Sequence, residues 1–190
     1  MDCCFKGTIS EFLGLSKDEW LGQMKDNYSA LTNEASSKEQ LAAWNDCYDK
    51  SLPFFKACVK YDCYIIFEYL LPREGGRRPD VLLLSGEHLF VLEYKMKESP
   101  TLADLDQIFA YARDLKNYHS ASHDLTVTPV LVLTKAINKK YHYDNVYICS
   151  PDKLEELIIS KLSNKQVISL DGWLKGEYAP LPSLVEAAKA

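Results

Sequence analysis

The first third of the chain and the remainder differ in how their apolar residues are spaced. In the first third they recur every three or four positions, as on one face of an amphipathic helix, and a capping sequence begins at Ser16. This pattern predicts helices over about 17–29 and 37–60, and Pro53 should kink or restart the second. From Cys63 onward, short runs of β-branched and aromatic residues predict strands, of which the middle ones are apolar on both faces.

The strands and helices expected after residue 62 alternate. The expected strands are 63–71, 79–84, 89–96, 130–134 and 145–149, with a last short strand at 167–168. The expected helices are 100–119, opened by Ser99-Pro100, and one that follows Ser150-Pro151. The order of these elements predicts an α/β fold with a mixed sheet, in which antiparallel hairpins come first, crossover connections follow, and helices cover both faces.

Length and composition are those of one globular domain with small appendages. Of the 190 residues, 47% are hydrophobic and 26% are charged. We expect an N-terminal helical extension over 1–36, a core over 37–170, and a C-terminal linker and helix over 171–190.

His119 and His123 lie four residues apart, a spacing that could hold a metal, but we interpret them as polar residues at a helix end.

Charge and cysteine usage narrow the possible functions. The net charge of −5 excludes a basic protein that coats nucleic acid, so any nucleic-acid function requires a local site. No apolar run approaches the roughly 18 residues of a membrane span, and the first residues lack a signal-peptide pattern. The six cysteines include no Cys-x-x-Cys pair. We interpret most of them as small buried side chains and expect a cytoplasmic protein that binds no membrane.

The residues that could carry out chemistry lie between Arg77 and Lys95. Gly86-Glu87 fits a two-residue hairpin turn, which places Asp80 opposite Glu93 and puts Lys95 on the same face of the sheet. Two carboxylates roughly 5 Å apart repel each other by about 3 kcal/mol, so we expect a cation between them. Oxygen ligands suit Mg²⁺, for which Mn²⁺ would substitute. Lys95 would orient or activate a water for attack on phosphorus.

Pro79-Asp80 followed by Glu93-Tyr94-Lys95 resembles the motif of the PD-(D/E)XK nuclease superfamily. The resemblance covers about 37–150 and implies a restriction-endonuclease-like core of αβββαβ order. It also implies that Asp80 and Glu93 ligate the metal and that Lys95 serves the attacking water. Many members carry a Gln and a Tyr one turn apart on the next helix. Gln107 and Tyr111 match this pattern, and an ordinary polar helix face is the alternative.

Further residues complete the expected site. Glu68, within the predicted strand 63–71, would approach Asp80 and join the metal site, or else face solvent from an edge strand. A backbone carbonyl and waters would complete the metal shell, and Tyr94 belongs to the expected ligands. Arg77 and Arg78 would hold phosphates at the mouth of the site, or be ordinary loop charges. The expected catalytic residues are Asp80, Glu93, Lys95, Glu68, Gln107 and Tyr111, and the expected metal ligands are Asp80, Glu93, Tyr94 and Glu68.

A narrower resemblance involves Trp44, Ser51 and the segment 67–72 ahead of Arg78-Pro79-Asp80. These residues are similar to those of the N-terminal nuclease domain in a bacterial protein family. In that family, a helicase-like P-loop ATPase domain follows the nuclease domain. The resemblance implies a nuclease acting on DNA, in defence against foreign DNA or in repair, with a linked or separate helicase-type ATPase as partner. The chain has no Gly-x-x-x-x-Gly-Lys-Ser/Thr sequence, so we expect no ATP binding. Two alternatives stay open, as does the oligomeric state: a catalytically idle module that binds nucleic acid or protein, and a metal-dependent ribonuclease.

Overall fold

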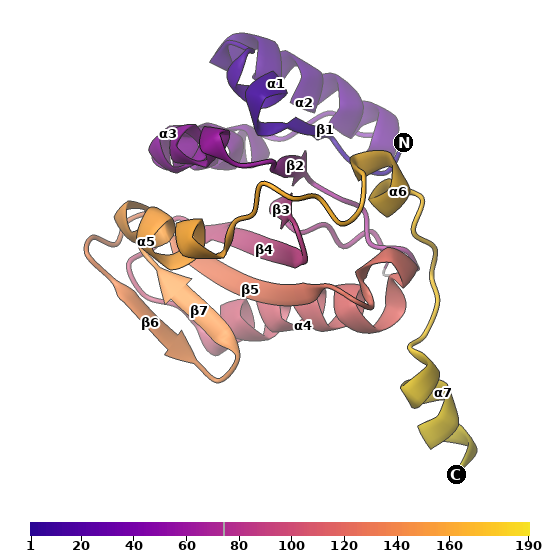
Figure 1. Ribbon diagram of the computed structural model, residues 1–190. Coiled ribbons are helices and arrows are strands. Elements are labelled where there is room, and N and C mark those ends of the chain that lie inside the picture. Colours follow the sequence, from indigo (N-terminus) through magenta and orange to yellow (C-terminus); the bar gives the residue numbers. More distant parts are fainter. Residues whose placement is uncertain (74) are drawn as a thin grey trace.

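The computed structural model describes residues 1–73 and 75–190, which form an α/β fold around a mixed sheet of seven strands (Figure 1). The strands are β1 (Phe5–Thr8), β2 (Tyr64–Phe67), β3 (Val81–Ser85), β4 (His88–Lys95), β5 (Thr126–Leu133), β6 (Lys140–Tyr143) and β7 (Val146–Cys149). Their order across the sheet is β1-β2-β3-β4-β5-β7-β6. The first four strands are antiparallel neighbours, β5 runs parallel to β4 and β7, and β6 is antiparallel to β7.

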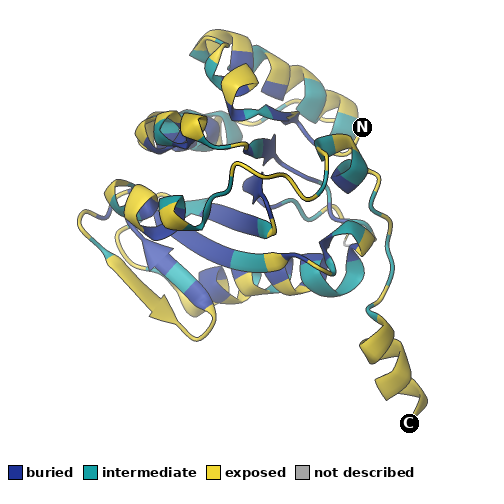
Figure 2. Cartoon of the chain, viewed as in Figure 1, coloured by how far each residue is buried: buried dark blue, intermediate teal, exposed yellow. Residues whose placement is uncertain are grey.

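Helices cover both faces of this sheet. They are α1 (Ile9–Leu13), α2 (Lys17–Thr32), α3 (Lys38–Ala57), α4 (Leu102–Tyr118), α5 (Leu154–Ile158), α6 (Leu170–Leu174) and α7 (Pro182–Lys189), with 3₁₀ turns at Cys58–Lys60, Ser120–Ser122, Pro151–Lys153 and Ile159–Lys161. Buried residues of α1, α2, α3 and α5 pack on one face of the sheet, and those of α4 and α6 pack on the other. Helix α7 buries no residue and projects away from the body (Figures 1 and 2).

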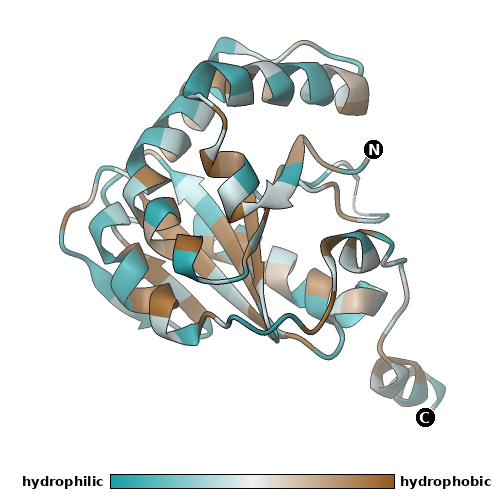
Figure 3. Cartoon of the chain, turned by 45° about the horizontal axis from the view of Figure 1, so that its top comes forward, coloured by the Kyte–Doolittle hydropathy of each residue, from teal (hydrophilic) through white to brown (hydrophobic). Residues whose placement is uncertain are grey.

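Alternate residues of the central hairpin supply both layers of the core. Val81, Leu83, Phe90 and Leu92 pack toward α3, and Leu82, Leu84, Leu89 and Val91 pack toward α4. All eight are buried, which confirms the prediction that the middle strands are apolar on both faces. In Figure 3 the central strands are largely hydrophobic, and the helices around them carry both hydrophilic and hydrophobic residues.

The hairpin register agrees with the sequence analysis. Leu84 pairs with Leu89 and Leu82 pairs with Val91, so the turn consists of Gly86 and Glu87. Gly86 has a φ of 55°, a conformation that glycine adopts without steric cost. A Cβ atom there would also lie 2.9 Å from the Cβ of Ser163.

The predicted helices form, with two corrections. Ser16 caps α2 in a reciprocal arrangement with Glu19, as the sequence indicates. Helix α3 continues through Pro53, so the predicted restart does not occur. The flanking Ser51 and Phe54 are buried, and this packing outweighs the missing helical hydrogen bond. Helix α4 begins after Thr101, not at Ser99-Pro100, because Thr101 and Asp104 cap each other's backbone N–H groups.

Several predicted strand limits were wrong. Strand β2 ends at Phe67, because Glu68 turns into the left-handed region with a φ of 53°. Strand β5 begins four residues before the predicted start at 130, and 167–168 is not a strand. The edge strands β1 and β6 were missed: β1 lies within the predicted helical extension 1–36, and every residue of β6 is exposed.

The C-terminal linker is partly integrated into the core. Trp173 of α6 is fully buried, stacks on His119 at 4.4 Å between ring centroids, and donates from Nε1 to Ser122 Oγ at 3.0 Å. His119 therefore takes part in packing at the end of α4. All six cysteines are buried and free, as predicted. In the described parts of the chain, no helix has the length and apolar character needed to cross a membrane.

Candidate active site

A cleft of about 350 Å³ opens between α3 and the neighbouring ends of β3 and β4. Trp44, Asp46 and Cys47 line it from α3. Glu68, Asp80, Glu93 and Lys95 line it from the strand ends. The cleft thus gathers four residues that the sequence analysis selected for their chemistry.

Asp80 and Glu93 are held side by side by the hairpin. Glu93 Oε2 accepts a hydrogen bond from the backbone N–H of Asp80 at 3.3 Å. Asp80 Oδ2 accepts one from the backbone N–H of Tyr94 at 2.8 Å. Each carboxylate is therefore fixed by the opposite segment, as expected when the hairpin register is extended one residue beyond β3.

The electrostatic environment of this pair is unfavourable to two negative charges. Burial raises the pKa of both carboxyl groups, and the charge of Asp80 raises the pKa of Glu93 further, to well above its ordinary value. The Tyr94 N–H and the Lys95 charge act in the opposite direction on Asp80. Glu93 is 5% exposed and Asp80 is half-buried, so a compensating cation would reach the pair through the cleft.

Lys95 supplies a positive charge that acts on both carboxyl groups of the pair. It lies two residues after Glu93 on β4, and its charge lowers the pKa of both carboxyl groups. Its backbone carbonyl accepts from Thr134 N–H at 2.9 Å, which anchors the strand. Within residues 1–73 and 75–190 its ammonium group forms no hydrogen bond or ion pair, so the group is available to a ligand in the cleft.

Glu68 lines the same cleft as the pair, but its carboxylate is engaged by Arg78 and Trp44. Its backbone N–H donates to the Asp80 carbonyl at 3.1 Å. Its carboxylate accepts from Arg78 Nε at 3.1 Å and from Trp44 Nε1 at 3.4 Å. Burial, and then the charge of Asp80, raise the pKa of Glu68 to about 7. Among the described residues, no three His, Cys, Asp or Glu side chains form a group able to hold a metal, so Glu68 does not extend the pair into a triad.

Both arginines expected to bind phosphate are engaged by carboxylates of the chain itself. Arg77 pairs with buried Asp114 at 3.2 Å and lies over the Tyr111 ring at 5.0 Å. Arg78 pairs with Glu68 and also donates to the Gly76 carbonyl at 2.9 Å. These ion pairs with buried carboxylates differ from both expectations, phosphate binding and ordinary loop charges.

Gln107 and Tyr111 lie one turn apart on α4 and are not among the residues that line the cleft. Gln107 Nε2 donates to the Tyr111 hydroxyl at 3.1 Å. Burial raises the pKa of Tyr111, and the charges of Glu93 and Asp80 raise it further, which places this hydroxyl in the field of the pair.

Asp46 and Cys47 also line the cleft, although the sequence analysis did not select them. Asp46 Oδ2 is buried and has no hydrogen-bond partner among the described residues. Burial, followed by the charges of Asp80 and Asp46, raises the pKa of the Cys47 thiol well above its ordinary value. Only the packing of α3 against the strand ends brings these side chains to the cleft, so no local sequence signal identifies them.

The donor atoms fit a small divalent cation. Asp80 and Glu93 offer adjacent carboxylate oxygens, the ligands that Mg²⁺ and Mn²⁺ prefer. Asp46 Oδ2, which has no hydrogen-bond partner among the described residues, lines the same cleft but does not form a three-carboxylate metal group with the pair. Tyr94 contributes its N–H, which orients Asp80.

Comparisons of the chain with protein-family models, with curated proteins and with solved structures found no match. Function must therefore be inferred from the fold and from this cleft.

Proposed function

We propose that this protein is a divalent-metal-dependent nuclease that hydrolyses phosphodiester bonds in DNA and has the core of the PD-(D/E)XK superfamily. The observation that carries the proposal is that one cleft holds the Asp80–Glu93 pair and the ammonium group of Lys95, which has no partner among the residues that the structure describes. Two adjacent, poorly hydrated carboxylates destabilise a fold unless a cation or proton compensates them. Metal binding for catalysis would explain why the two carboxylates lie together beside an available ammonium group.

The order of elements supports the proposed core. Helix α3, strands β2, β3 and β4, helix α4 and strand β5 follow one another in the αβββαβ order that the resemblance implies. The motif residues Asp80, Glu93 and Lys95 lie on the β3–β4 hairpin. The resemblance to nuclease domains that precede a P-loop ATPase supports a helicase-type partner and a role in DNA defence or repair.

The motif residues and the α4 pair have distinct tasks in this proposal. Asp80 and Glu93 hold the cation, which when bound polarises a phosphoryl oxygen and lowers the pKa of water. Lys95 orients the attacking water and stabilises negative charge that develops at phosphorus. Tyr94 N–H fixes the Asp80 carboxylate, and the Gln107–Tyr111 pair positions substrate from α4.

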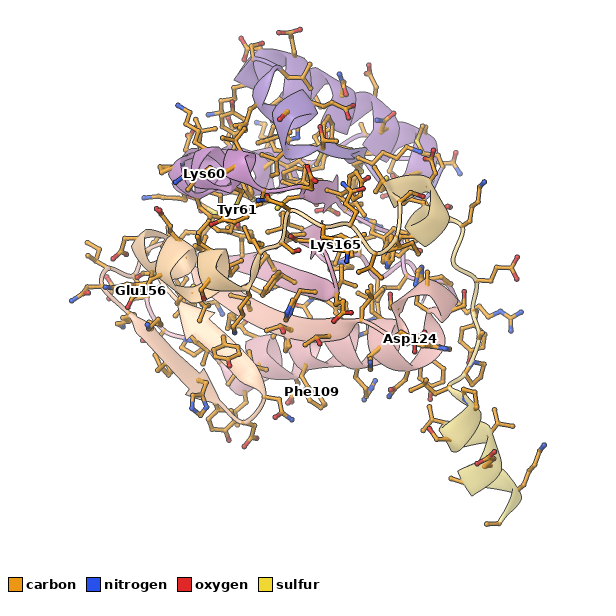
Figure 4. All side chains as sticks on the ribbon, viewed as in Figure 1. Lys60, Tyr61, Phe109, Asp124, Glu156 and Lys165 are labelled. Carbon is orange, nitrogen blue, oxygen red and sulfur yellow. The ribbon has the colours of Figure 1, made fainter. Side chains whose placement is uncertain are left out.

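The test is cleavage of single-stranded DNA, duplex DNA and RNA in Mg²⁺, in Mn²⁺ and in EDTA. We expect wild type to cut DNA only with metal. Lys95→Ala should lose at least about 100-fold in rate, of the order expected for a general acid–base group, while it keeps its fold. Lys165→Ala, at an exposed position in the 162–169 segment (Figure 4), is the matched control and should cut normally.

Two results would contradict the proposal. The first is absence of cleavage by wild type with every metal, which is the outcome for an idle binding module. The second is equal cleavage by wild type and Lys95→Ala. Cleavage confined to RNA would identify the ribonuclease alternative.

A further inference from the structure

Four lysines, which we call the lysine edge, lie at and beyond the carboxyl ends of β4 and β5, and the first of them lines the cleft that holds the carboxyl pair. They are Lys95, Lys97, Lys135 and Lys139. Two neighbouring segments carry them, the end of β4 and the connection from β5 to β6. Thr134 N–H donates to the Lys95 carbonyl at 2.9 Å, and Lys135 N–H donates to the Lys97 carbonyl at 3.3 Å. Lys139 Nζ reaches the Glu98 carbonyl at 3.0 Å, so the segments lie side by side along this length.

Most of the positive charge on the lysine edge is not neutralised within the chain. Lys95 and Lys135 form no side-chain hydrogen bond or ion pair in the part of the chain that the structure describes, and Lys139 Nζ contacts only a neutral carbonyl. Lys97 pairs with Asp104 at 2.6 Å, and its side chain remains 40% exposed. In a chain of net charge −5, this is the local cationic surface that binding to a polyanion requires.

Two exposed apolar side chains interrupt the lysines. Met96 is 46% exposed and Ile137 is 81% exposed. Met96 also lines the active-site cleft, so the lysine edge and the cleft are continuous. Ammonium groups that alternate with apolar surface suit a nucleic-acid strand, because phosphates meet the charges while sugars and bases meet the apolar atoms.

Arg77 and Arg78 are poor candidates for binding the phosphates of a nucleic acid, since both already neutralise carboxylates of the chain. We propose that the lysine edge holds the phosphate backbone of a nucleic-acid strand that runs from the carboxyl pair across the carboxyl ends of β4 and β5. The inference rests on the proposed nuclease function and specifies where the flanking substrate lies.

The test is binding without cleavage. Anisotropy of a labelled DNA single strand of about 20 nucleotides, and of the matching duplex, is measured in EDTA between about 50 and 200 mM salt. Lys135→Ala and Lys139→Ala should each weaken single-strand binding about fivefold near 0.1 M salt and reduce the salt slope by about 0.7. Lys135→Arg should bind like wild type, because it keeps the charge.

Lys165 provides the matched control. It lies near the Gly86 turn, at the other end of the β3–β4 hairpin from the carboxyl pair, and Lys165→Ala should leave affinity and slope unchanged. Absence of DNA binding by wild type would overturn the inference. So would a Lys135→Ala/Lys139→Ala double variant that binds with wild-type affinity and slope, even if wild type cleaves DNA. Conversely, lysine-dependent binding by a protein that never cleaves would support the surface while the proposed nuclease function fails.

Discussion

Arg78 donates from Nε to Glu68 Oε2 at 3.1 Å, in an ion pair whose side chains are only 18% and 5% exposed. Glu68 in turn donates its backbone N–H to the carbonyl of Asp80. This contact couples the end of β2, the loop before β3 and the candidate active site. It also explains how a carboxylate is tolerated beside the negatively charged pair, since Arg78 and Trp44 both lower the pKa that burial and Asp80 raise.

Arg78→Ala should therefore destabilise the protein by about 3 kcal/mol, because the variant leaves Glu68 buried without its counterion. Lys17→Ala is the control, since the Lys17–Asp49 pair is exposed and should contribute less than about 1 kcal/mol. Urea unfolding of both variants measures the difference. If the two substitutions cost the same, the Glu68–Arg78 pair has no special stabilising role. The double variant Arg78→Ala/Glu68→Gln should recover part of the loss.

Glu93→Gln should raise the stability of the metal-free protein by up to about 3 kcal/mol, because it replaces a carboxyl group whose ionisation is opposed by burial and by Asp80, and it retains the side-chain shape. The same change should abolish the rise in Tm that Mn²⁺ produces in wild type. Thermal unfolding with and without Mn²⁺ checks both effects. Glu87→Gln, at the exposed hairpin turn, should change neither. An unchanged Mn²⁺ shift in Glu93→Gln would remove Glu93 from the metal site.

Acid should destabilise the protein through His119. Burial, assisted by the charge of His123, lowers the pKa of His119 to about 4, whereas the unfolded chain has a value of about 6.5. Between these values the unfolded chain binds a proton that the folded protein excludes. The free energy of unfolding should thus fall by about 3 kcal/mol as the pH drops from 6.5 to 4.

His119→Phe tests this assignment, because it keeps a ring against Trp173 and cannot be protonated. Urea unfolding across this pH range should show a weaker pH dependence for the variant than for wild type. An identical pH dependence would assign the acid sensitivity to other groups.

Gly176→Ala should destabilise the docked C-terminal segment by about 1–3 kcal/mol. A Cβ atom at this position would lie 2.2 Å from His119 Cε1, and Trp173 stacks against that ring, so it cannot easily move aside. Gly22→Ala is the control: it lies within α2, and beyond its chain neighbours and the helix backbone nothing lies within 4 Å of its Cβ position, so alanine should stabilise the helix by about 0.5–1 kcal/mol. Thermal unfolding of the two variants should shift in opposite directions.

Local interactions explain which features were predictable from the sequence. Ser16 and Glu19 cap a helix because they are three residues apart. Gly86 permits the positive φ of a two-residue turn, and the alternation of side chains then brings Asp80 opposite Glu93. The carboxyl pair thus depends on residues within a single hairpin, and this is why its proximity could be predicted without the rest of the fold.

Contacts between distant segments decided the remaining features. Glu68 and Arg78 neutralise each other, and Arg77 pairs with Asp114, because separate elements pack together; no spacing in the chain encodes these choices. Strand β6 is fully exposed, so its pairing with β7 leaves no hydrophobic pattern. Asp46 reaches the cleft only after α3 has packed on the sheet, and Lys135 and Lys139 join Lys95 and Lys97 only after β5 has paired with β4. The sequence by itself determined the carboxyl pair through hairpin geometry, whereas tertiary packing decided which charges around it were neutralised and which stayed available.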